Sequence, residues 1–175
     1  MAVVSLLVVL SCSSTQQASR SDSRDSGPFP GWYSSGEMTA TPSGFSAYGT
    51  AVAADSAAAR RKAVTQALVN LEQHLSARLE SIRKEAIRSD SDGNGSGLDS
   101  ASFIFALRNA EGGISGLATP SRVQAAPNRG LEGYRGFAEV TLSRKELMAY
   151  LDSEFGSGGS AWQTLKASKA FADGL

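Results

Sequence analysis

The amino-acid sequence predicts an α+β fold, a small three-stranded sheet packed on one long amphipathic helix, in the order β–α–(α)–β–β–α. Three observations predict it. Small residues alternate over 45–53, aliphatic residues recur at helical spacing over 64–82, and two strand-like segments flank a turn-rich connection at 127–133. The chain has 175 residues, 41% of them apolar, and alanine supplies much of that share. It therefore has room for one modest domain with a small core, plus tails.

The first strand and the long helix are expected to pack face to face. In "FSAYGTAVAA", Phe45, Ala47 and Gly49 fall on one face of the strand, and these small residues would let a helix approach closely. Asp55 or Ser56 is the expected N-cap. One apolar stripe then runs along the helix, made by Val64, Leu68, Leu71, Leu75, Leu79 and Ile82. No sustained heptad series accompanies the stripe, so packing on the sheet is favoured over a coiled coil.

The later elements follow in order along the chain. "LDSASFIFALRNA" predicts a short helix capped by Asp99 or Ser100. "PSRVQAA" and "YRGFAEVTLS" predict an antiparallel hairpin, since apolar and polar residues alternate in the second segment. "SRKE" at 143–146 has the pattern of a capping box, and it opens a helix that Gly156 is expected to end.

The N-terminus carries the only cysteine, Cys12, which the single residue Ser11 separates from the apolar run "AVVSLLVVL". That run has the length of a signal-peptide core and is too short to span a bilayer. Val9-Leu10-Ser11-Cys12 resembles a bacterial lipobox, which implies cleavage after residue 11 and acyl chains on Cys12. Residues 1–11 are then a lipoprotein signal peptide and 12–28 a disordered tether. The alternative is a chance apolar N-terminus with a free cysteine.

Three segments together resemble one known family. "FPGWYSSGE" at 29–37, the stretch 44–75 beginning "GFSAYGTAVAAD", and "GYRGFAEVTLSRKELMAYL" at 133–151 are similar to the LPP-twenty family of bacterial envelope lipoproteins. The resemblance covers 29–155 and leaves 156–175 as a loose C-terminal tail with at most a short helix. It implies a non-enzymatic structural, assembly or interaction role in the cell envelope.

Localisation and partners follow as expectations from the anchor and the family. The membrane is contacted through the acyl chains on Cys12. Ser13 is not the aspartate that commonly retains lipoproteins in the inner membrane, which favours the outer membrane. The protein partner is an unidentified envelope protein, with self-association as one option. Seventeen basic residues balance seventeen acidic ones, so no nucleic-acid partner is expected.

Catalytic, cofactor and metal sites are not expected. The sole histidine, His74, lies beside the helical stripe, and no second histidine or folded-domain cysteine accompanies it. "DSDGNG" at 90–95 begins like a calcium-binding EF-hand loop, but Ala101 stands where the loop needs a bidentate glutamate. A linker is therefore favoured there. Asp22 and Asp25 fall in the tether, where nothing would position them as a catalytic pair.

Two segments of the sequence could contact a partner molecule, and for each the alternative is a purely structural role. "RRK" at 60–62 is favoured as solvated helix charge, with anionic headgroups as the alternative partner. Phe29, Trp32 and Tyr33 in "GPFPGWY" are expected to form an ordered entry segment in which Trp32 covers one end of the core, with docking of a partner protein as the alternative. The competing function is a periplasmic ligand-binding module, with a pocket formed by the small-residue strand and a hinge at 89–98.

Overall fold

The computed structural model describes residues 29–35, 38–89, 94–129, 132–156 and 159–175. Its sheet is antiparallel and has four strands in the order β1-β2-β4-β3. Their bounds are β1 (Thr39–Thr41), β2 (Gly44–Ala53), β3 (Thr119–Pro127) and β4 (Tyr134–Ser143). The α+β class, the first strand and the hairpin of β3 with β4 are confirmed.

The prediction of three strands is wrong, because β1 adds a fourth at the edge. It has only three residues, all exposed, and it pairs with the start of β2 through a tight turn. The Thr41 side chain accepts a hydrogen bond from the Gly44 amide at 3.2 Å. A strand this short, with no buried face, leaves no hydrophobic alternation to detect.

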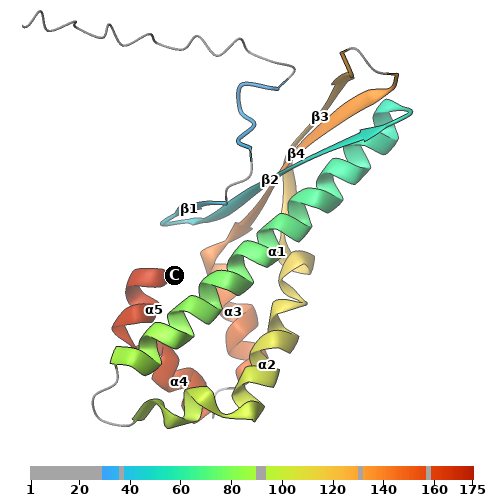
Figure 1. The fold of residues 1–175 in the computed structure, drawn as a ribbon. Coiled ribbons are helices and arrows are strands. Elements are labelled where there is room, and N and C mark those ends of the chain that lie inside the picture. The colour runs from blue at the N-terminus through green and yellow to red at the C-terminus, as the bar shows by residue number, and fades with distance from the viewer. Residues whose placement is uncertain (1–28, 36–37, 90–93, 130–131, 157–158) are drawn as a thin grey trace, which may run out of the picture.

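The long helix α1 (Ser56–Ser89) lies across one face of the sheet and extends well beyond it (Figure 1). Asp55 is its N-cap, since its carboxylate accepts a hydrogen bond from the Ala58 amide at 2.8 Å. The predicted stripe is confirmed in its second half, where Leu71, Leu75 and Leu79 are fully buried. In the first half the deepest contacts come from alanines, whereas Val64 and Leu68 are only partly buried.

The sheet and α1 approach each other at glycine. A Cβ atom on Gly49 of β2 would lie 2.3 Å from the Ala63 carbonyl oxygen, and one on Gly136 of β4 would lie 2.1 Å from the Ala59 carbonyl oxygen. Both distances are far below contact, so only glycine fits at either position. The expected close approach over a small-residue face is therefore confirmed.

The second half of α1 is surrounded by shorter helices that form a helical lobe opposite the β3–β4 hairpin (Figure 1). These are η1 (Asn94–Asp99), α2 (Ala101–Glu111), η2 (Ile114–Leu117), α3 (Arg144–Phe155), α4 (Ser160–Ala167) and α5 (Lys169–Gly174). The predicted caps are present at α2 and α3. Ser100 accepts from the Phe103 amide, and Ser143 accepts from the Glu146 amide. Gly156 ends α3 at a φ of 68°.

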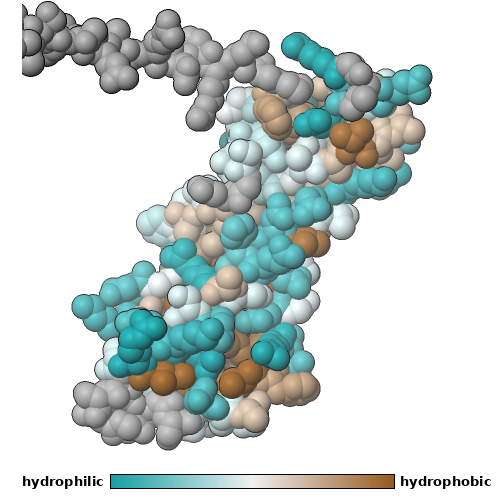
Figure 2. Space-filling model, in the orientation of Figure 1, coloured by the Kyte–Doolittle hydropathy of each residue, from teal (hydrophilic) through white to brown (hydrophobic). Residues whose placement is uncertain are grey.

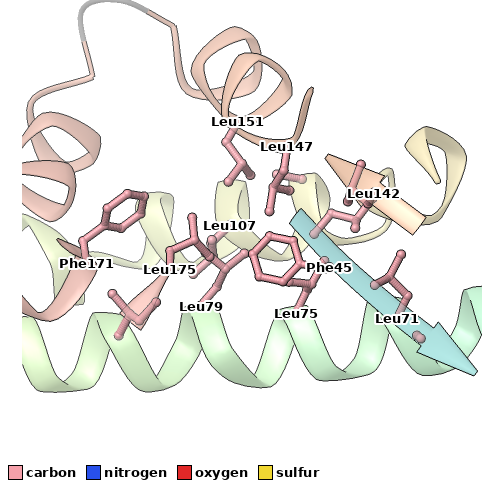
Figure 3. Packing of buried hydrophobic residues seen from close by; sticks show 14 of the residues in the cluster. Phe45, Leu71, Leu75, Leu79, Leu107, Leu142, Leu147, Leu151, Phe171 and Leu175 are labelled. Atoms are coloured by element: carbon pink, nitrogen blue, oxygen red, sulfur yellow. The ribbon is translucent and has the colours of Figure 1, made fainter. Parts of the chain in front are cut away.

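One continuous core joins the sheet to the helical lobe. Figure 3 shows Phe45 of β2 and Leu142 of β4 meeting the leucines of α1. Side chains from α2, α3 and α5 complete the same cluster. Within the described residues, no helix is both long and apolar enough to cross a membrane.

The loose tail expected at 156–175 is instead folded where the structure describes it. Trp162 and Leu165 of α4 and Phe171 of α5 are buried, and Trp162 stacks on Phe155 with ring centroids 4.7 Å apart. The Trp162 indole donates a 2.7 Å hydrogen bond to the Asp152 carboxylate. The described part of 156–175 therefore belongs to the core of the helical lobe.

Candidate interaction surface

An open groove runs between the first turns of α1 and the edge strand β3. It has a volume of about 580 Å³ and is lined by Ala57, Arg60, Arg61, Val64, Thr65 and Val123. We call these six residues the arginine groove. Two arginines and two valines line the same hollow, so the groove combines positive charge with apolar surface.

The sheet register explains why Val123 meets α1. Val123 of β3 pairs with Ala138 of β4, which in turn pairs with Gly49 of β2. Gly49 contacts α1, so these three residues lie on the helix face of the sheet. Since β3 is the outermost strand, Val123 is still 40% exposed and forms one wall of the groove.

The arginines of the groove are exposed and unneutralised. Arg60 and Arg61 lie one turn before Val64 and Thr65 on the same side of α1. Across the part of the chain that the structure describes, neither arginine forms an ion pair. The "RRK" segment is thus exposed helix charge, as predicted, and two of its members border a hollow that the sequence did not reveal.

Arg122 of β3, by contrast, is engaged on the opposite face of the sheet. Its Nε lies 3.3 Å from the Glu139 carboxylate, and the Tyr48 hydroxyl donates to the same carboxylate at 3.3 Å. Burial, and then the negative charge of Glu139, raise the pKa of Tyr48. This network stabilises the outer face of β2, β4 and β3 and adds no free charge to the groove.

The aromatic entry segment packs on that outer face. The Tyr33 and Phe29 rings contact Phe137 of β4 with centroid distances of 5.3 and 5.6 Å, and Tyr33 also meets Tyr48 at 6.0 Å. Burial raises the pKa of Tyr33. The entry segment is therefore ordered, but Tyr33 and Phe29 make the central contacts, and Trp32 packs against the side of Tyr33 at 6.3 Å.

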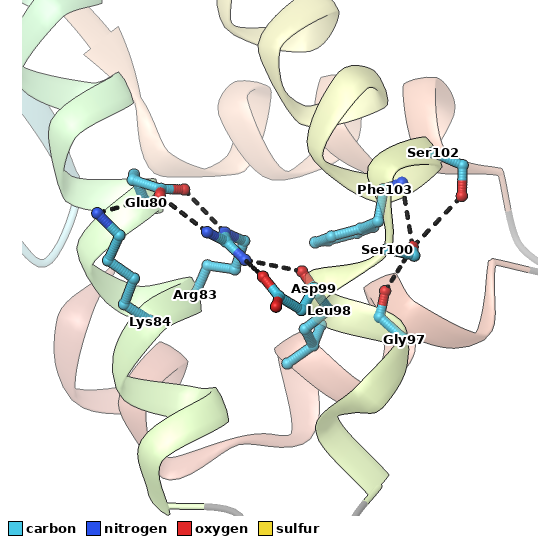
Figure 4. Close-up of polar contacts among 9 residues, drawn as sticks. All are labelled: Glu80, Arg83, Lys84, Gly97, Leu98, Asp99, Ser100, Ser102 and Phe103. Carbon is cyan, nitrogen blue, oxygen red and sulfur yellow. Dashed lines mark hydrogen bonds and ion pairs between the residues drawn. The ribbon is translucent and has the colours of Figure 1, made fainter.

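A second hollow of about 260 Å³ lies between α1 and α2, lined by Ser76, Ala77, Glu80, Ile104, Leu107, Arg108 and Glu111. Burial, and then the charge of Glu80, raise the pKa of Glu111. Glu80 itself already binds two cations, because it accepts from Arg83 at 2.8 and 2.9 Å and lies 3.3 Å from Lys84 (Figure 4).

Arg83 connects α1 to η1 through hydrogen bonds, a structural role that the sequence analysis did not predict. It is buried, and its Nη1 donates to the Leu98 carbonyl at 2.9 Å and to Asp99 at 3.2 Å (Figure 4). These two contacts bind η1 to α1, and the two hydrogen bonds that Arg83 donates to Glu80 of its own helix hold the guanidinium in position. A charge within a helix of mixed charges gives no sign that it is buried, so no sequence pattern identified it.

The other residues considered as candidate sites are either exposed in the structure or lie outside the residues that it describes. His74 is exposed on α1. Cys12, Asp22, Asp25 and most of the calcium-like loop, including Asp90 and Asp92, lie outside the described residues. Among the residues that are described, no three His, Cys, Asp or Glu side chains gather as a metal-binding group.

The pocket of the competing ligand-binding function was expected on the small-residue strand. That face of β2 is filled by α1, since Gly49 lies against the helix backbone. The expected pocket is therefore absent from this face of the described sheet. The α1–α2 hollow is another described place where such a module could hold a ligand.

Comparisons with known proteins give no further constraint: no protein-family model, no curated protein and no solved structure matches this chain. The similarity to the LPP-twenty family stays a prediction from the quoted segments.

Proposed function

We propose that this protein is a lipid-anchored lipoprotein of the bacterial cell envelope, held at the outer membrane by acyl chains on Cys12, with a non-enzymatic structural, assembly or interaction role. One observation carries the proposal. The only cysteine of the chain stands one residue after a short apolar run and is followed by a polar, serine-rich segment that leads to the folded unit. Each buried CH₂ of an acyl chain contributes ~0.8 kcal/mol, so two or three chains anchor a protein durably.

The fold is compatible with display on a tether. The described unit begins at Phe29, and residues 13–28 span at most about 55 Å when fully extended. The side chains on the face seen in Figure 2 are mostly polar, with apolar ones scattered among them. The arginine groove supports a role in binding another molecule, since it offers exposed charge beside apolar surface.

Cell fractionation of a Cys12→Ser variant tests the anchor. The variant is expected to leave the membrane fraction of the native host, because serine lacks the thiol that accepts diacylglycerol. Ser13→Ala is the matched control and should stay with the membrane. A Cys12→Ser protein that remains in the membrane fraction to the same extent as the wild type would refute the anchor.

A second candidate function is the periplasmic ligand-binding module. The α1–α2 hollow favours it, because Glu111 and Arg108 share that hollow with apolar side chains. A thermal-shift screen of small polar and amphiphilic compounds separates the two functions. Stabilisation that Glu111→Gln abolishes would favour ligand binding, and a flat screen together with a co-purifying envelope protein would favour the interaction role.

A further inference from the structure

We propose that the arginine groove docks an extended, acidic segment of a partner protein, which adds as a strand to the free edge of β3. The inference rests on the proposed function as an interaction protein, and it names the surface and the chemistry of the partner. Three features of the described residues support it: the position of β3 in the sheet, the side chains beside it, and the sign of their charge.

The first feature is the free backbone edge. β3 pairs with β4 on one side, and no other described strand pairs with its other side. The outward N–H and C=O groups of such a strand are available to an added strand. Pro120 and Pro127 lack an N–H, and the register of β3 shifts between Pro120 and Arg122, so the regular part of the edge is the five residues 122–126 and it accepts a short segment rather than an open-ended stack.

The second feature is the groove beside that edge. Alternate side chains of an added strand would point toward α1, as Val123 does. There they would meet Arg60 and Arg61 and the apolar surface of Val64 and Val123. A carboxylate can bind a guanidinium through paired, charge-assisted hydrogen bonds. The fitting segment therefore presents carboxylates and a branched apolar side chain on one face.

The third feature is the positive charge of the groove, which favours an acidic partner segment over a second copy of this chain. A second copy added edge to edge would bring its own Arg60 and Arg61 toward the same two arginines, and β3 carries no acidic residue to offset them. Like charges opposed across a pair of strands are destabilising. Anionic lipid headgroups would satisfy the charges but would not use the backbone edge or the valines.

The test uses the full-length protein, purified in a nonionic detergent from whichever cell fraction contains it, and fluorescent seven-residue peptides. The probe Thr-Glu-Thr-Val-Thr-Glu-Thr places both glutamates and the valine on one face when extended. We expect saturable binding by fluorescence anisotropy and slower amide exchange at residues 122–126. A probe with lysine in place of glutamate, and one with proline in place of the two central threonines, should both bind at least about tenfold more weakly.

A matched pair of variants locates the site. Arg60→Glu with Arg61→Glu should weaken binding of the acidic probe by at least about tenfold. Lys145→Glu with Lys169→Glu makes the same change in net charge at exposed positions on α3 and α5, and it should leave binding unchanged. All four positions are exposed and outside the ion pairs of the described residues, so both variants should keep the wild-type melting temperature.

Four results would overturn the proposal. The first is that the acidic probe does not bind, and the second is that it binds the Arg60/Arg61 variant as tightly as the wild type. The third is a dimer that forms through the β3 edge. The fourth is that phosphatidylglycerol in mixed micelles binds in a way that depends on Arg60 and Arg61, while the peptide does not bind. Acylation of Cys12 is measured separately by mass. A result that refutes peptide binding at the arginine groove therefore leaves the proposed lipid anchor untouched. A result that refutes the lipid anchor likewise leaves the proposed binding at the groove untouched.

Discussion

Single glycines set how closely the sheet and α1 pack. Gly49 and Gly136 stand where any Cβ would strike the backbone of the helix. The small residues around Gly49 made this contact predictable from the alternation over 45–53. Gly136 lies in a strand whose other residues are larger, so its role becomes visible only once the register places it opposite Ala51.

Gly49→Ala should destabilise the protein by about 1–3 kcal/mol, because the added methyl group forces the sheet and helix apart. Alanine lowers the entropy of the unfolded chain, which stabilises by only ~0.4–1 kcal/mol, so the steric cost prevails. Urea denaturation followed by circular dichroism measures the difference. Gly116→Ala is the control, since nothing lies within 4 Å of its Cβ position. Equal midpoints for the two variants would contradict the packing described.

The Glu80–Arg83 pair makes stability depend on pH in the acid range. Hydrogen bonds from Arg83, aided by Lys84 and opposed by burial, lower the pKa of Glu80 from its usual 4.5 to about 2. Because the folded pKa is depressed, the stabilising contribution is fully present above the unfolded pKa. It is lost as pH falls from about 4.5 toward about 2.

Glu80→Gln should therefore be less stable than the wild type at neutral pH, and the gap should close as pH falls through that window. Denaturation midpoints at pH values from about 6 to about 2 measure the gap. Glu85→Gln is the control, because it removes a carboxylate of α1 whose pairing with Arg88 is exposed. A gap that stays constant with pH would show that Glu80 does not titrate in this way.

At the scale of elements, the sequence predicted those that have a clear period and a clear cap. The strand at β2, the helix at α1 and the hairpin of β3 with β4 all combine alternation or a stripe with turn residues at their ends. β1 was missed because three exposed residues have no period. The described helices α4 and α5 are short, and their burial depends on side chains that arrive from α1 and α3, which local patterns do not report.

Trp162 tests whether the C-terminal helices belong to the core. Trp162→Ala should cost about 3–5 kcal/mol of unfolding free energy, since the indole is 1% exposed and packs between Phe155 and Phe171. Gln163→Ala, at an exposed neighbouring position, should change stability little. Chemical denaturation of both variants measures their unfolding free energies. A near-neutral Trp162→Ala would mean that the tail is loose, as the sequence had indicated.

Only one of the two sides of the arginine groove could be predicted from the sequence. The basic segment at 60–62 was visible in the sequence as helix charge. Val123 lies about sixty positions further along the chain, and it comes near this segment only through the register of β3 against β4 and the packing of α1 on the sheet. A functional surface formed by two distant elements has no signature in either one alone.

At the scale of the whole molecule, we propose that an acylated Cys12 and a polar tether display a folded unit whose arginine groove lies beside strand β3. Such an anchor would confine the groove to the membrane surface, and such a tether would let it reach a partner over tens of ångströms. A short acidic strand from an envelope protein would then bind at raised local concentration, so even a weak contact would be occupied.

Intact mass spectrometry of the protein from native cells is the sharpest test of the proposed anchor. We expect a chain of residues 12–175 carrying two or three acyl chains, with the added mass localised to Cys12 by fragmentation. An unmodified chain that still begins at Met1 and is recovered in the soluble fraction would contradict it.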